Sequence, residues 1–376
     1  MKKDSPSALP SYADFVIIGA GIMGLCTGLY LARSGKEVVI LERTEPWREA
    51  SAVNAGGLGV QNKRLPLIPI ALESIQIWKK FQEELGGDVG FIQTGGIRVA
   101  TTSEEVNRLQ ESLGLQREAG LNKQWLEGEA LKSKAPWAGD TVLAATYCEF
   151  DSIANPLITG HVLQQAVRKL DARIFSNTEV VHINRNVPGF TLNTTNGTIT
   201  CKNLIVAAAV WSKKLIRDLD IDLPIALDVN IVTVTEPVCP ILNMLLSHIR
   251  GILTVRQYPN GTCVIGGGWQ GNGSLEPGRK EINYASFLHN IRLAAEIIPE
   301  LKNVNIVRSW SGFEGVTPDS LPLLGRLPGQ EDAYIIGNVR GGWTVAPVLS
   351  RLLVELITEG KTSRPIDEFD PGRFLK

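Results

Sequence analysis

Cysteine and histidine are scarce in this chain of 376 residues, and neither is patterned. The sequence has five cysteines and four histidines, and no two cysteines form a C-x-x-C pair. Zinc and iron–sulfur sites need clustered thiolates or imidazoles, so the sequence predicts no metal site. An odd, scattered set of cysteines is also typical of a reducing compartment rather than of a disulfide-stapled secreted domain.

Long hydrophobic runs and an excess of one charge are also missing. No stretch reaches the ~18 apolar residues of a membrane-spanning helix. The first apolar run, after residues 1–7, is broken by a glycine turn and does not make a signal-peptide core. The formal net charge is -1, which argues against partners such as nucleic acid or an anionic membrane. We therefore expect a cytoplasmic protein without a membrane span.

An apolar strand that runs into a glycine-rich turn is the most informative feature that is present. Residues 15–18 are apolar, and glycines follow at positions 19, 21 and 24, just ahead of a helical segment at 25–33. Gly19 permits a tight turn, Gly21 lets the backbone approach a pyrophosphate, and Gly24 lets the helix pack on the strand. The start of the helix then offers free N–H groups to phosphates.

A second apolar strand, at residues 37–41, ends in Glu42, which lies 23 residues after Gly19. This is close to the spacing at which an acidic side chain accepts hydrogen bonds from ribose hydroxyls. This order of elements predicts a dinucleotide-binding unit: a strand, a glycine-rich turn, a helix, a second strand and an acidic residue at its end. On these residues alone the dinucleotide is NAD or FAD.

Periodicity and turn signals predict further elements along the chain. Helices are expected at 68–85, at 103–114 with a serine N-cap, at 156–170 with Asn155 as N-cap, at 280–298 and at 345–358. Strands are expected at 95–100, 203–209, 225–235, 304–313 and 333–336, with hairpins around residues 196–197 and 252–267. Residues 51–58 are too rich in glycine and polar side chains for a core helix.

The chain begins and ends with strand–glycine-loop–helix segments, which indicates one nucleotide domain built from both termini. The predicted fold class is α/β with α+β: a Rossmann-like domain and an inserted domain with a mixed or antiparallel sheet. We predict the first domain from residues 1–80, 150–220 and 325–376. The second, substrate-binding domain would contain residues 81–149 and 221–324.

Four blocks of the sequence resemble the D-amino-acid-oxidase (DAO) superfamily of FAD-dependent oxidoreductases: residues 19–42, 51–58, 310–325 and 337–347. The third block carries the most specific pattern, a tryptophan–glycine pair, then Thr-Pro-Asp, then Pro-x-x-Gly. The resemblance is strongest to the branch that holds glycine oxidases, the β-subunits of sarcosine and opine oxidases, and the large subunit of hydrogen cyanide synthase. It implies FAD as cofactor and a glutathione-reductase-like two-domain fold.

The resemblance also implies which residues bind FAD. N–H groups at the start of the last helix would face the flavin N1/O2 region, where negative charge develops on reduction, and small residues after position 53 would lie against the ring. The implied set is Gly19, Gly21, Ile22, Met23, Gly24, Glu42, Arg43, Ser51, Asn54, Ala55, Gly56, Gly57, Leu58, Val180, Ala208, Trp211, Gly312, Asp319, Gly341, Gly342, Trp343 and Thr344.

The sequence departs from some of its relatives in ways that matter. Asn54 stands where dimethylglycine-dehydrogenase-like members carry a flavin-linked histidine, and residues 321–326 lack the linking cysteine of monomeric sarcosine oxidases, so we expect non-covalent FAD. Those oxidases also have a lysine where Thr344 stands and an oxygen-reactive lysine in a hairpin strand that corresponds to 262–265. Neither lysine is present here, which weighs against direct use of oxygen.

The family chemistry implied is oxidation of an amine or amino-acid C–N bond by hydride transfer to flavin N5, after which water hydrolyses the imine. A substrate carboxylate needs a cation or a tyrosine. Glycine oxidases have an arginine for this purpose where Glu314 stands, so another group must serve, and Glu314 is free to receive the amine or guanidine end. The candidate residues are Arg256 and Tyr258 on one strand face, Arg340, Arg64, Glu314, and Trp343 and Trp269 as apolar walls.

Four functions remain open on the sequence. The first is the catalytic β-subunit of a heteromeric dehydrogenase acting on an opine-, glycine-, proline- or sarcosine-like amine, whose partner subunits relay the electrons and whose interface has room for a second flavin, FMN. The second is a stand-alone glycine or D-amino-acid oxidase that uses oxygen. The third is a non-catalytic flavin-binding scaffold, and the fourth is an NAD-dependent dehydrogenase.

Overall fold

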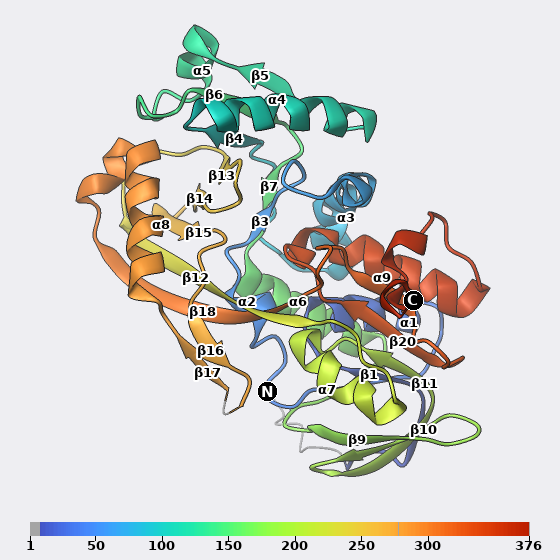
Figure 1. Ribbon diagram of the computed structural model, residues 1–376. Helices are drawn as coiled ribbons and strands as arrows, with labels where there is room; N and C mark the ends of the chain where they lie inside the picture. The colour runs from blue at the N-terminus through green and yellow to red at the C-terminus, as the bar shows by residue number, and fades with distance from the viewer. Residues whose placement is uncertain (1–7, 277, 376) are drawn as a thin grey trace.

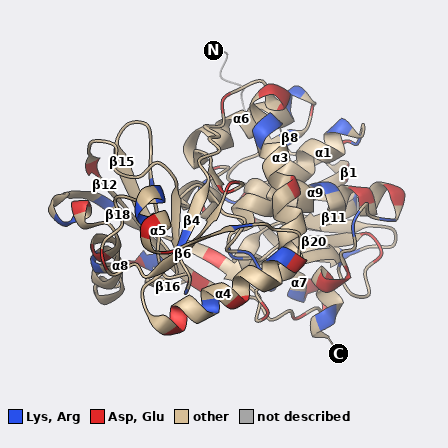
Figure 2. Cartoon of the chain, turned by 90° about the horizontal axis from the view of Figure 1, so that it is seen from above, with Lys and Arg blue, Asp and Glu red and all other residues tan. Residues whose placement is uncertain are grey.

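The computed structural model describes residues 8–276 and 278–375. Residues 1–7, which precede the first apolar run, lie outside the described residues. Within the described part, no helix combines the length and the apolar character needed to cross a bilayer. Basic and acidic positions are spread over elements throughout the molecule (Figure 2).

The first large sheet has eight strands, and its central order is β19–β20–β11–β1–β2–β8. Neighbours along this path are parallel except β19, which is antiparallel to β20. The hairpin strands β9 and β10 extend from β11. The bounds are β1 (Tyr12–Ile18), β2 (Val38–Leu41), β8 (Arg173–Phe175), β9 (Val180–Arg185), β10 (Phe190–Thr194), β11 (Gly197–Val206), β19 (Leu323–Arg326) and β20 (Ala333–Gly337).

The central strands of this sheet are buried on both faces, which explains the apolar runs at residues 15–18, 38–41 and 333–336. Phe15 and Ile17 of β1 face a core that includes residues of α1 (Ile22–Arg33), α3 (Ile68–Leu85), α6 (Pro156–Lys169) and α9 (Gly342–Glu359). Val16 and Ile18 face the opposite core, which is formed with β9, β10 and α7 (Ser212–Ile216). Because side chains alternate along β1, this one strand contributes to the core on each side of the sheet.

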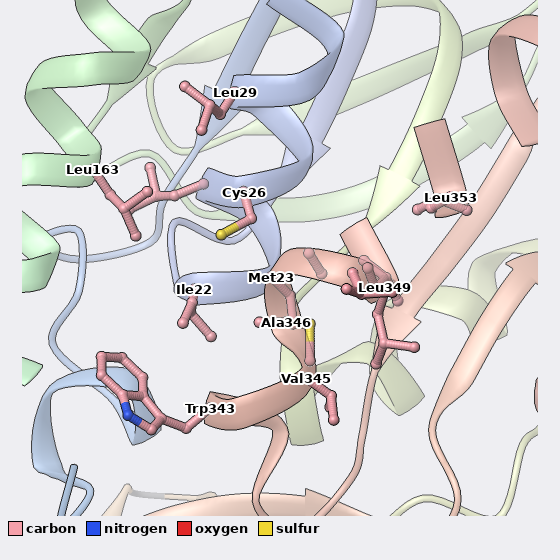
Figure 3. Close-up of a cluster of buried hydrophobic side chains, with 14 of the residues drawn as sticks. Ile22, Met23, Cys26, Leu29, Leu163, Trp343, Val345, Ala346, Leu349 and Leu353 are labelled. Atoms are coloured by element: carbon pink, nitrogen blue, oxygen red, sulfur yellow. The ribbon is translucent and has the colours of Figure 1, made fainter. Parts of the chain in front are cut away.

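The first and last long helices of the chain, α1 and α9, pack against each other. Figure 3 shows their side chains in one buried cluster with Leu163 of α6: Ile22, Met23, Cys26 and Leu29 from α1, and Val345, Ala346, Leu349 and Leu353 from α9. The hydroxyl of Ser350 donates to the carbonyl oxygen of Met23 at 3.3 Å. This packing joins the two ends of the described chain into one layer (Figure 1).

The second large sheet has the order β18–β12–β15–β14–β13–β4–β6–β5, and it is antiparallel except for the pair β13–β4. The long strands β12 and β18 reach from this sheet toward α7 of the first half (Figure 1). The bounds are β4 (Gly96–Ala100), β5 (Gln124–Leu126), β6 (Ala144–Cys148), β12 (Ala226–Pro237), β13 (Leu245–His248), β14 (Thr254–Gln257), β15 (Thr262–Gly266) and β18 (Ile306–Val316).

The two faces of the second sheet differ in character. Ile97, Val255 and Ile265 point into an apolar core with α8 (Tyr284–Ile297), while residues that alternate with them point inward, toward the first half of the molecule. Two further helices, α4 (Ser103–Glu118) and α5 (Gly128–Lys134), lie in the segment between β4 and β6. One face of this sheet therefore builds stability and the other is available for a site.

Short elements complete the described fold. The helix α2 (Ala50–Val53) precedes β3 (Gly57–Leu58), which pairs with β7 (Ser152–Ile153), and β16 (Asn272–Ser274) pairs with β17 (Arg279–Glu281). The 3-10 turns are η1 (Leu65–Leu67), η2 (Ala209–Trp211), η3 (Arg217–Leu219), η4 (Pro299–Asn303), η5 (Asp367–Phe369) and η6 (Pro371–Phe374).

Several predicted element boundaries need correction. The N-cap of α4 is Thr102 rather than Ser103, because the Thr102 hydroxyl and the Glu105 carboxylate satisfy each other's backbone N–H groups in a capping box. Residues 279–281 form a strand, so α8 begins at 284 rather than at 280. The helix α9 begins at 342, earlier than predicted. The four-residue helix α2 has no fully buried residue, so it does not contradict the prediction that residues 51–58 form no core helix.

Other predictions are confirmed by the described residues. The helix α3 has the predicted bounds, and Asn155 caps α6 by accepting the N–H of Leu157 at 3.0 Å. The predicted fold class, a Rossmann-like sheet with an inserted mixed sheet, is confirmed. The strands of the first sheet lie within residues 12–41, 173–206 and 323–337, and those of the second within 96–148, 226–266 and 306–316. The domain boundaries themselves remain a prediction.

Candidate active site

The turn between β1 and α1 can be formed only with glycine at two positions. Gly19 has φ +107°, and a Cβ there would lie 2.6 Å from the carbonyl oxygen of Ala207. A Cβ on Gly24 would lie 1.9 Å from the carbonyl oxygen of Gly19. Because no side chain tolerates such contacts, these glycines are what lets α1 start so close to the ends of β1 and β11.

The start of α1 is capped from another segment. Gly21 is the N-cap and has no side chain, and Ser51 of α2 supplies the acceptor: its Oγ receives the N–H of Ile22 at 2.9 Å. Gly21, Ile22 and Met23 line a cavity of about 860 Å³, the first cavity. The unsatisfied N–H groups and the dipole of a helix start favour an anion at this wall.

Glu42 lines the first cavity at the end of β2, beside the glycine turn. Its carboxylate accepts the backbone N–H of Ala20 at 2.9 Å and that of Thr44 at 3.1 Å. These two bonds hold the carboxylate in place next to the start of α1. An oriented acid beside a glycine-rich helix start is the arrangement that dinucleotide sites use for ribose and pyrophosphate.

A stacked pair of side chains forms another wall of the first cavity. The guanidinium of Arg43 lies 3.7 Å from the centroid of the Trp211 ring and is paired with Glu49 at 3.1 Å. The other neighbour of Trp211 is Phe313, whose ring centroid is 5.9 Å away in an edge-on arrangement. Flat, partly polar walls of this kind suit a planar heterocycle.

The loop after α2 separates the first cavity from a second one, and β18 holds it there. The indole N–H of Trp310 donates to the carbonyl oxygen of Val53 at 2.9 Å, and a Cβ on Gly312 would lie 2.3 Å from a Val53 methyl group. The Asn54 side chain caps α2 by donating to the carbonyl oxygen of Ser51 at 2.7 Å. The tryptophan–glycine pair of the third sequence block therefore positions this loop.

The second cavity, of about 990 Å³, lies on the inward face of the second sheet. Arg98, Thr254 and Arg256 point into it, as the alternation on β4 and β14 requires. Arg256 is only 2% exposed, forms no salt bridge with a described residue, and leaves its buried Nε without an acceptor there. A guanidinium in such a position lacks the anion that its burial calls for.

A cluster of charges stands where the two cavities meet. Glu314 lines both cavities and accepts the side-chain amide of Asn230 at 2.6 Å and the backbone N–H of Gly341 at 3.2 Å. Arg340 pairs with Asp228, and its Nε lies 3.8 Å from Glu314. Burial raises the pKa of Glu314, and the nearby Arg340 opposes that rise. The carboxylate therefore has a shared cation rather than one of its own.

Lys63 is a site residue that sequence reasoning missed. It lies in the loop between β3 and η1, is 9% exposed, and donates from Nζ to the carbonyl oxygen of Gly341 at 2.8 Å. Burial lowers the pKa of Lys63 to about 8. No periodicity marks a single loop lysine, so nothing in the sequence pointed to it. Positions 344 and 262–265 carry no lysine, but Lys63, from another segment, brings an ammonium group to the loop that contains Gly341.

Comparison with known proteins decides the family. The family model described as DAO, FAD dependent oxidoreductase, matches residues 14–356 of this chain. The chain belongs to this family. The prediction of an FAD-dependent oxidoreductase is therefore confirmed.

Individual relatives match over almost the whole chain. Glycine oxidase from Geobacillus kaustophilus (strain HTA426) is 28% identical over 372 residues, covering 96% of this chain and 97% of that protein. An opine oxidase subunit from Rhizobium meliloti is 26% identical over 374 residues, with the same coverage of 96% and 97%. The solved structure of L-proline dehydrogenase from P. horikoshii has a TM-score of 0.90 at 26% identity and covers 98% of this chain and 99% of that one.

The cofactor of this DAO-family chain fits the first cavity. Three features of this cavity suit a dinucleotide: the glycine turn with no room for a Cβ, the N-terminal end of the α1 dipole, and the oriented Glu42 carboxylate. Of the residues implied to bind FAD, those that line this cavity are Gly19, Gly21, Ile22, Met23, Glu42, Arg43, Ser51, Asn54, Val180, Ala208, Trp211, Gly341, Gly342 and Trp343. Those that line the second cavity are Asn54, Ala55, Gly56, Gly57, Gly312, Gly341 and Trp343.

Some predicted cofactor residues lie in neither wall. Gly24 packs against the glycine turn, and Leu58 is buried in the core around α1. Thr344 is buried in the first turn of α9, where its carbonyl oxygen accepts the indole N–H of Trp78 at 3.1 Å. Asp319 is an exposed turn residue that pairs with Arg373 at 2.8 Å. The structure gives these residues supporting contacts rather than a place at a cavity.

The candidate substrate residues separate in the same way. Arg64, Arg256, Glu314, Arg340 and Trp343 line the second cavity. Tyr258 does not: its ring lies beside Arg256, and its hydroxyl is 3.5 Å from the carbonyl oxygen of Ala154. Trp269 also lies elsewhere, stacked on His289 at 5.3 Å. In the described residues no group of three His, Cys, Asp or Glu is arranged to hold a metal ion.

Proposed function

We propose that this chain oxidises the C–N bond of an amino acid or secondary amine whose carboxylate binds Arg256. The observation that carries the proposal is the buried Arg256 guanidinium, which has no anionic partner among the described residues and faces a cavity. Charge-assisted hydrogen bonds from a bound carboxylate would satisfy it. The relatives named glycine oxidase, opine oxidase and proline dehydrogenase support a substrate of this class.

FAD bound in the first cavity would supply the two-electron acceptor for a hydride from the carbon that carries the nitrogen, and water then hydrolyses the imine to a carbonyl compound and an amine. The protein's part is to hold the substrate in the second cavity with that carbon toward the first. Residues of the loop 54–57 and of 341–343 line the boundary between the cavities. Trp343, which is 6% exposed, gives that boundary an apolar wall.

We assign the amine end of the substrate to Glu314. Its carboxylate lies at the junction of the cavities, and hydrogen bonds from Asn230 and Gly341 fix both of its oxygens in position. Arg340, the cation next to the Glu314 carboxylate, is shared with Asp228. A substrate ammonium group beside Glu314 would give this carboxylate a cation of its own. Because burial raises the pKa of Glu314, this carboxylate is also suited to take a proton from the amine at Oε1 or Oε2.

Non-covalent attachment of FAD is supported by where the reactive side chains lie. Position 54 is an asparagine, which forms no flavin linkage. Cys26, Cys148, Cys201 and Cys263 are buried, and none of them is in the wall of either cavity. We therefore expect denaturation to release FAD intact.

The electron acceptor divides two versions of this function. A β-subunit that passes electrons to partner subunits is supported by the relative whose name makes it one subunit of an opine oxidase. A stand-alone oxidase is favoured by one observation: the Lys63 ammonium lies at the Gly341 loop, where a cation would stabilise negative charge that develops on oxygen. Rapid return of the flavin colour in air would support the oxidase, and slow return would support electron transfer to a partner subunit. A second flavin, FMN, would then bind at the interface with that partner.

The proposal is tested by anaerobic titration of the purified holoprotein with amino acids, N-alkyl amino acids and opines, following the flavin absorbance. We expect one class to bleach the flavin. In Arg256→Met the substrate concentration for half-reduction should rise about 100-fold, since charge-assisted contacts to a buried cation contribute about 3 kcal/mol. The flavin spectrum before substrate addition should be unchanged.

Arg308→Met is the matched control, because Arg308 is an exposed arginine on the same sheet and lines neither cavity. It should titrate like the wild type. The proposal fails if no amine bleaches the flavin, which would favour a scaffold, or if Arg256→Met is reduced as readily as the wild type.

A further inference from the structure

A second arginine on the same sheet face, Arg98, has no use in the function proposed above. We propose that it binds a second carboxylate, so that the substrate is an amine with two carboxylates rather than a simple amino acid. This inference rests on the proposed function and names its substrate class. The carboxylate next to the reacting carbon would bind Arg256, and the remote carboxylate would bind Arg98.

The register of the second sheet fixes how the two arginines are related. Leu245 of β13 pairs with Gly96 of β4, so Ser247 is opposite Arg98, and the same β13 pairs with β14 so that Ser247 is opposite Thr254. Arg98 and Arg256 therefore lie two strands apart and are displaced by two residues along the strands. With ~4.8 Å between strands and ~3.4 Å per residue, their Cα atoms are ~12 Å apart.

Both side chains leave the sheet on the face that forms the second cavity. Side chains that leave the sheet side by side from Cα atoms ~12 Å apart would hold a ligand whose carboxylates are about 6 Å apart, since each charge-assisted hydrogen bond takes up about 2.8 Å. That separation is found in an N-carboxyalkyl amino acid or in an amino acid with a carboxylate at the end of its side chain.

Arg98 has donors to spare. It donates to the backbone carbonyl oxygens of Gln61 and Ile249, both at 2.8 Å, and its buried Nε finds no acceptor among the described residues. It forms no salt bridge with a described residue. Carbonyl groups orient the guanidinium but do not neutralise it, so its charge remains available to an anion.

The surroundings of Arg98 carry an excess of positive charge. The acid that influences it is Asp151, whose oxygens already accept the N–H groups of Val60 and Gln61. Close by, the Lys123 ammonium is buried without a described hydrogen-bond partner. Burial lowers the pKa of Lys123 to about 8, and repulsion from Arg98 contributes to that shift. Asp151 thus acts on both of these buried cations and on Lys63, and a bound carboxylate would restore the balance.

Other cations of the second cavity are less suited to this role. Arg340 is paired with Asp228, and Arg250 is exposed and 3.9 Å from Glu105. Arg108 is exposed and paired with Glu104 at 3.7 Å. Arg64 also lines the cavity without a described carboxylate partner, but it is exposed and contacts the Ser320 hydroxyl at 3.4 Å. Arg98 and Arg256 are thus the described arginines of this cavity that are not exposed and have no carboxylate partner.

The test compares substrate pairs that differ only in the second carboxylate: 2-aminoadipate against norleucine, in both configurations, and iminodiacetate against N-methylglycine. Anaerobic flavin reduction gives the half-saturating concentration for each. In the wild type we expect the dicarboxylate of at least one pair to bind more than 10-fold better. Arg98→Met should abolish that preference and leave the monocarboxylates unchanged, and Arg98→Lys should keep part of it.

A second readout does not need turnover. Glutarate should raise the thermal unfolding temperature of the wild-type holoprotein more than butyrate does, and Arg98→Met should remove the difference while Arg308→Met keeps it. If Arg98→Met does not fold, the wild-type and Arg98→Lys comparisons still decide. Equal binding of the paired ligands, or a preference that survives Arg98→Met, overturns the proposal. If glutarate binds but no amine bleaches the flavin, the proposed function fails and the subsite stands.

Discussion

Replacing Lys63 by methionine should make the free energy of unfolding depend less on pH in the alkaline range. In the fold, burial lowers the pKa of Lys63 from 10.5 to about 8. Its ammonium has one described hydrogen bond, 2.8 Å long, to a neutral carbonyl oxygen. A buried cation that is held only by a carbonyl group destabilises the folded state whenever it is protonated.

The magnitude follows from linkage between proton binding and folding. The difference between the two pKa values corresponds to about 3 kcal/mol of destabilisation below pH 8. Between pH 8 and pH 10.5 the unfolded chain holds a proton on Lys63 that the folded chain has lost, so the free energy of unfolding rises with pH in that window. From pH 7 to pH 10 the wild type should gain about 2 kcal/mol relative to Lys63→Met.

The measurement is urea unfolding of the cofactor-free protein at pH 7, 8, 9 and 10, since the structure describes the chain without its cofactor. At pH 7 Lys63→Met should be the more stable protein by about 2 kcal/mol, after about 1 kcal/mol is subtracted for the lost hydrogen bond. Lys132→Met, which changes a lysine that is 76% exposed, is the control and should show no such trend. A difference between wild type and Lys63→Met that stays constant from pH 7 to pH 10 would refute the reasoning.

Two further predictions concern the glycine turn and Asp319. Gly24→Ala should abolish FAD binding or folding, since its Cβ would lie 1.9 Å from the carbonyl oxygen of Gly19, whereas Gly114→Ala, where a Cβ meets nothing within 4 Å, should stabilise the fold by about 1 kcal/mol; bound flavin and melting temperature distinguish the outcomes. Asp319→Asn should weaken the partly exposed pair with Arg373 and cost about 1 kcal/mol in urea unfolding. A changed flavin spectrum in Asp319→Asn would show that Asp319 contacts the cofactor after all.

Local signals in the sequence accounted for most of the elements. The helix 68–85 was predicted from an apolar repeat that one buried face requires, and Asn155 from the rule that a short polar side chain caps a helix start. The errors have local causes as well. Ser103 and Thr102 are both good N-caps, and only the backbone geometry shows which one accepts the N–H of Glu105. The apolar spacing near residue 280 resembles a helix, but pairing with β16 makes it a strand.

Part of the candidate site followed from order along the chain. A glycine turn must follow its strand directly, and an acid at the end of the next parallel strand must lie beside that turn, so Gly19, Gly21 and Glu42 were predictable together. Arg256 was selected because it stands on a hairpin strand. The strand 95–100 carried a similar signal, since Arg98 alternates with Ile97 and Val99, but alternation alone does not show whether the polar face meets water or a cavity.

The family of this protein, its FAD dependence and the turn that requires glycine could all be read from the linear chain, because each of the four motif blocks is a short run of consecutive residues. The arrangement of charge could not. Contacts between Lys63 and Gly341, between Trp310 and Val53, and between Arg98 and Gln61 join distant segments and exist only in the folded chain. Whether a charged side chain finds a partner, a carbonyl group or an open cavity depends on which strands become neighbours, and no local pattern records that choice.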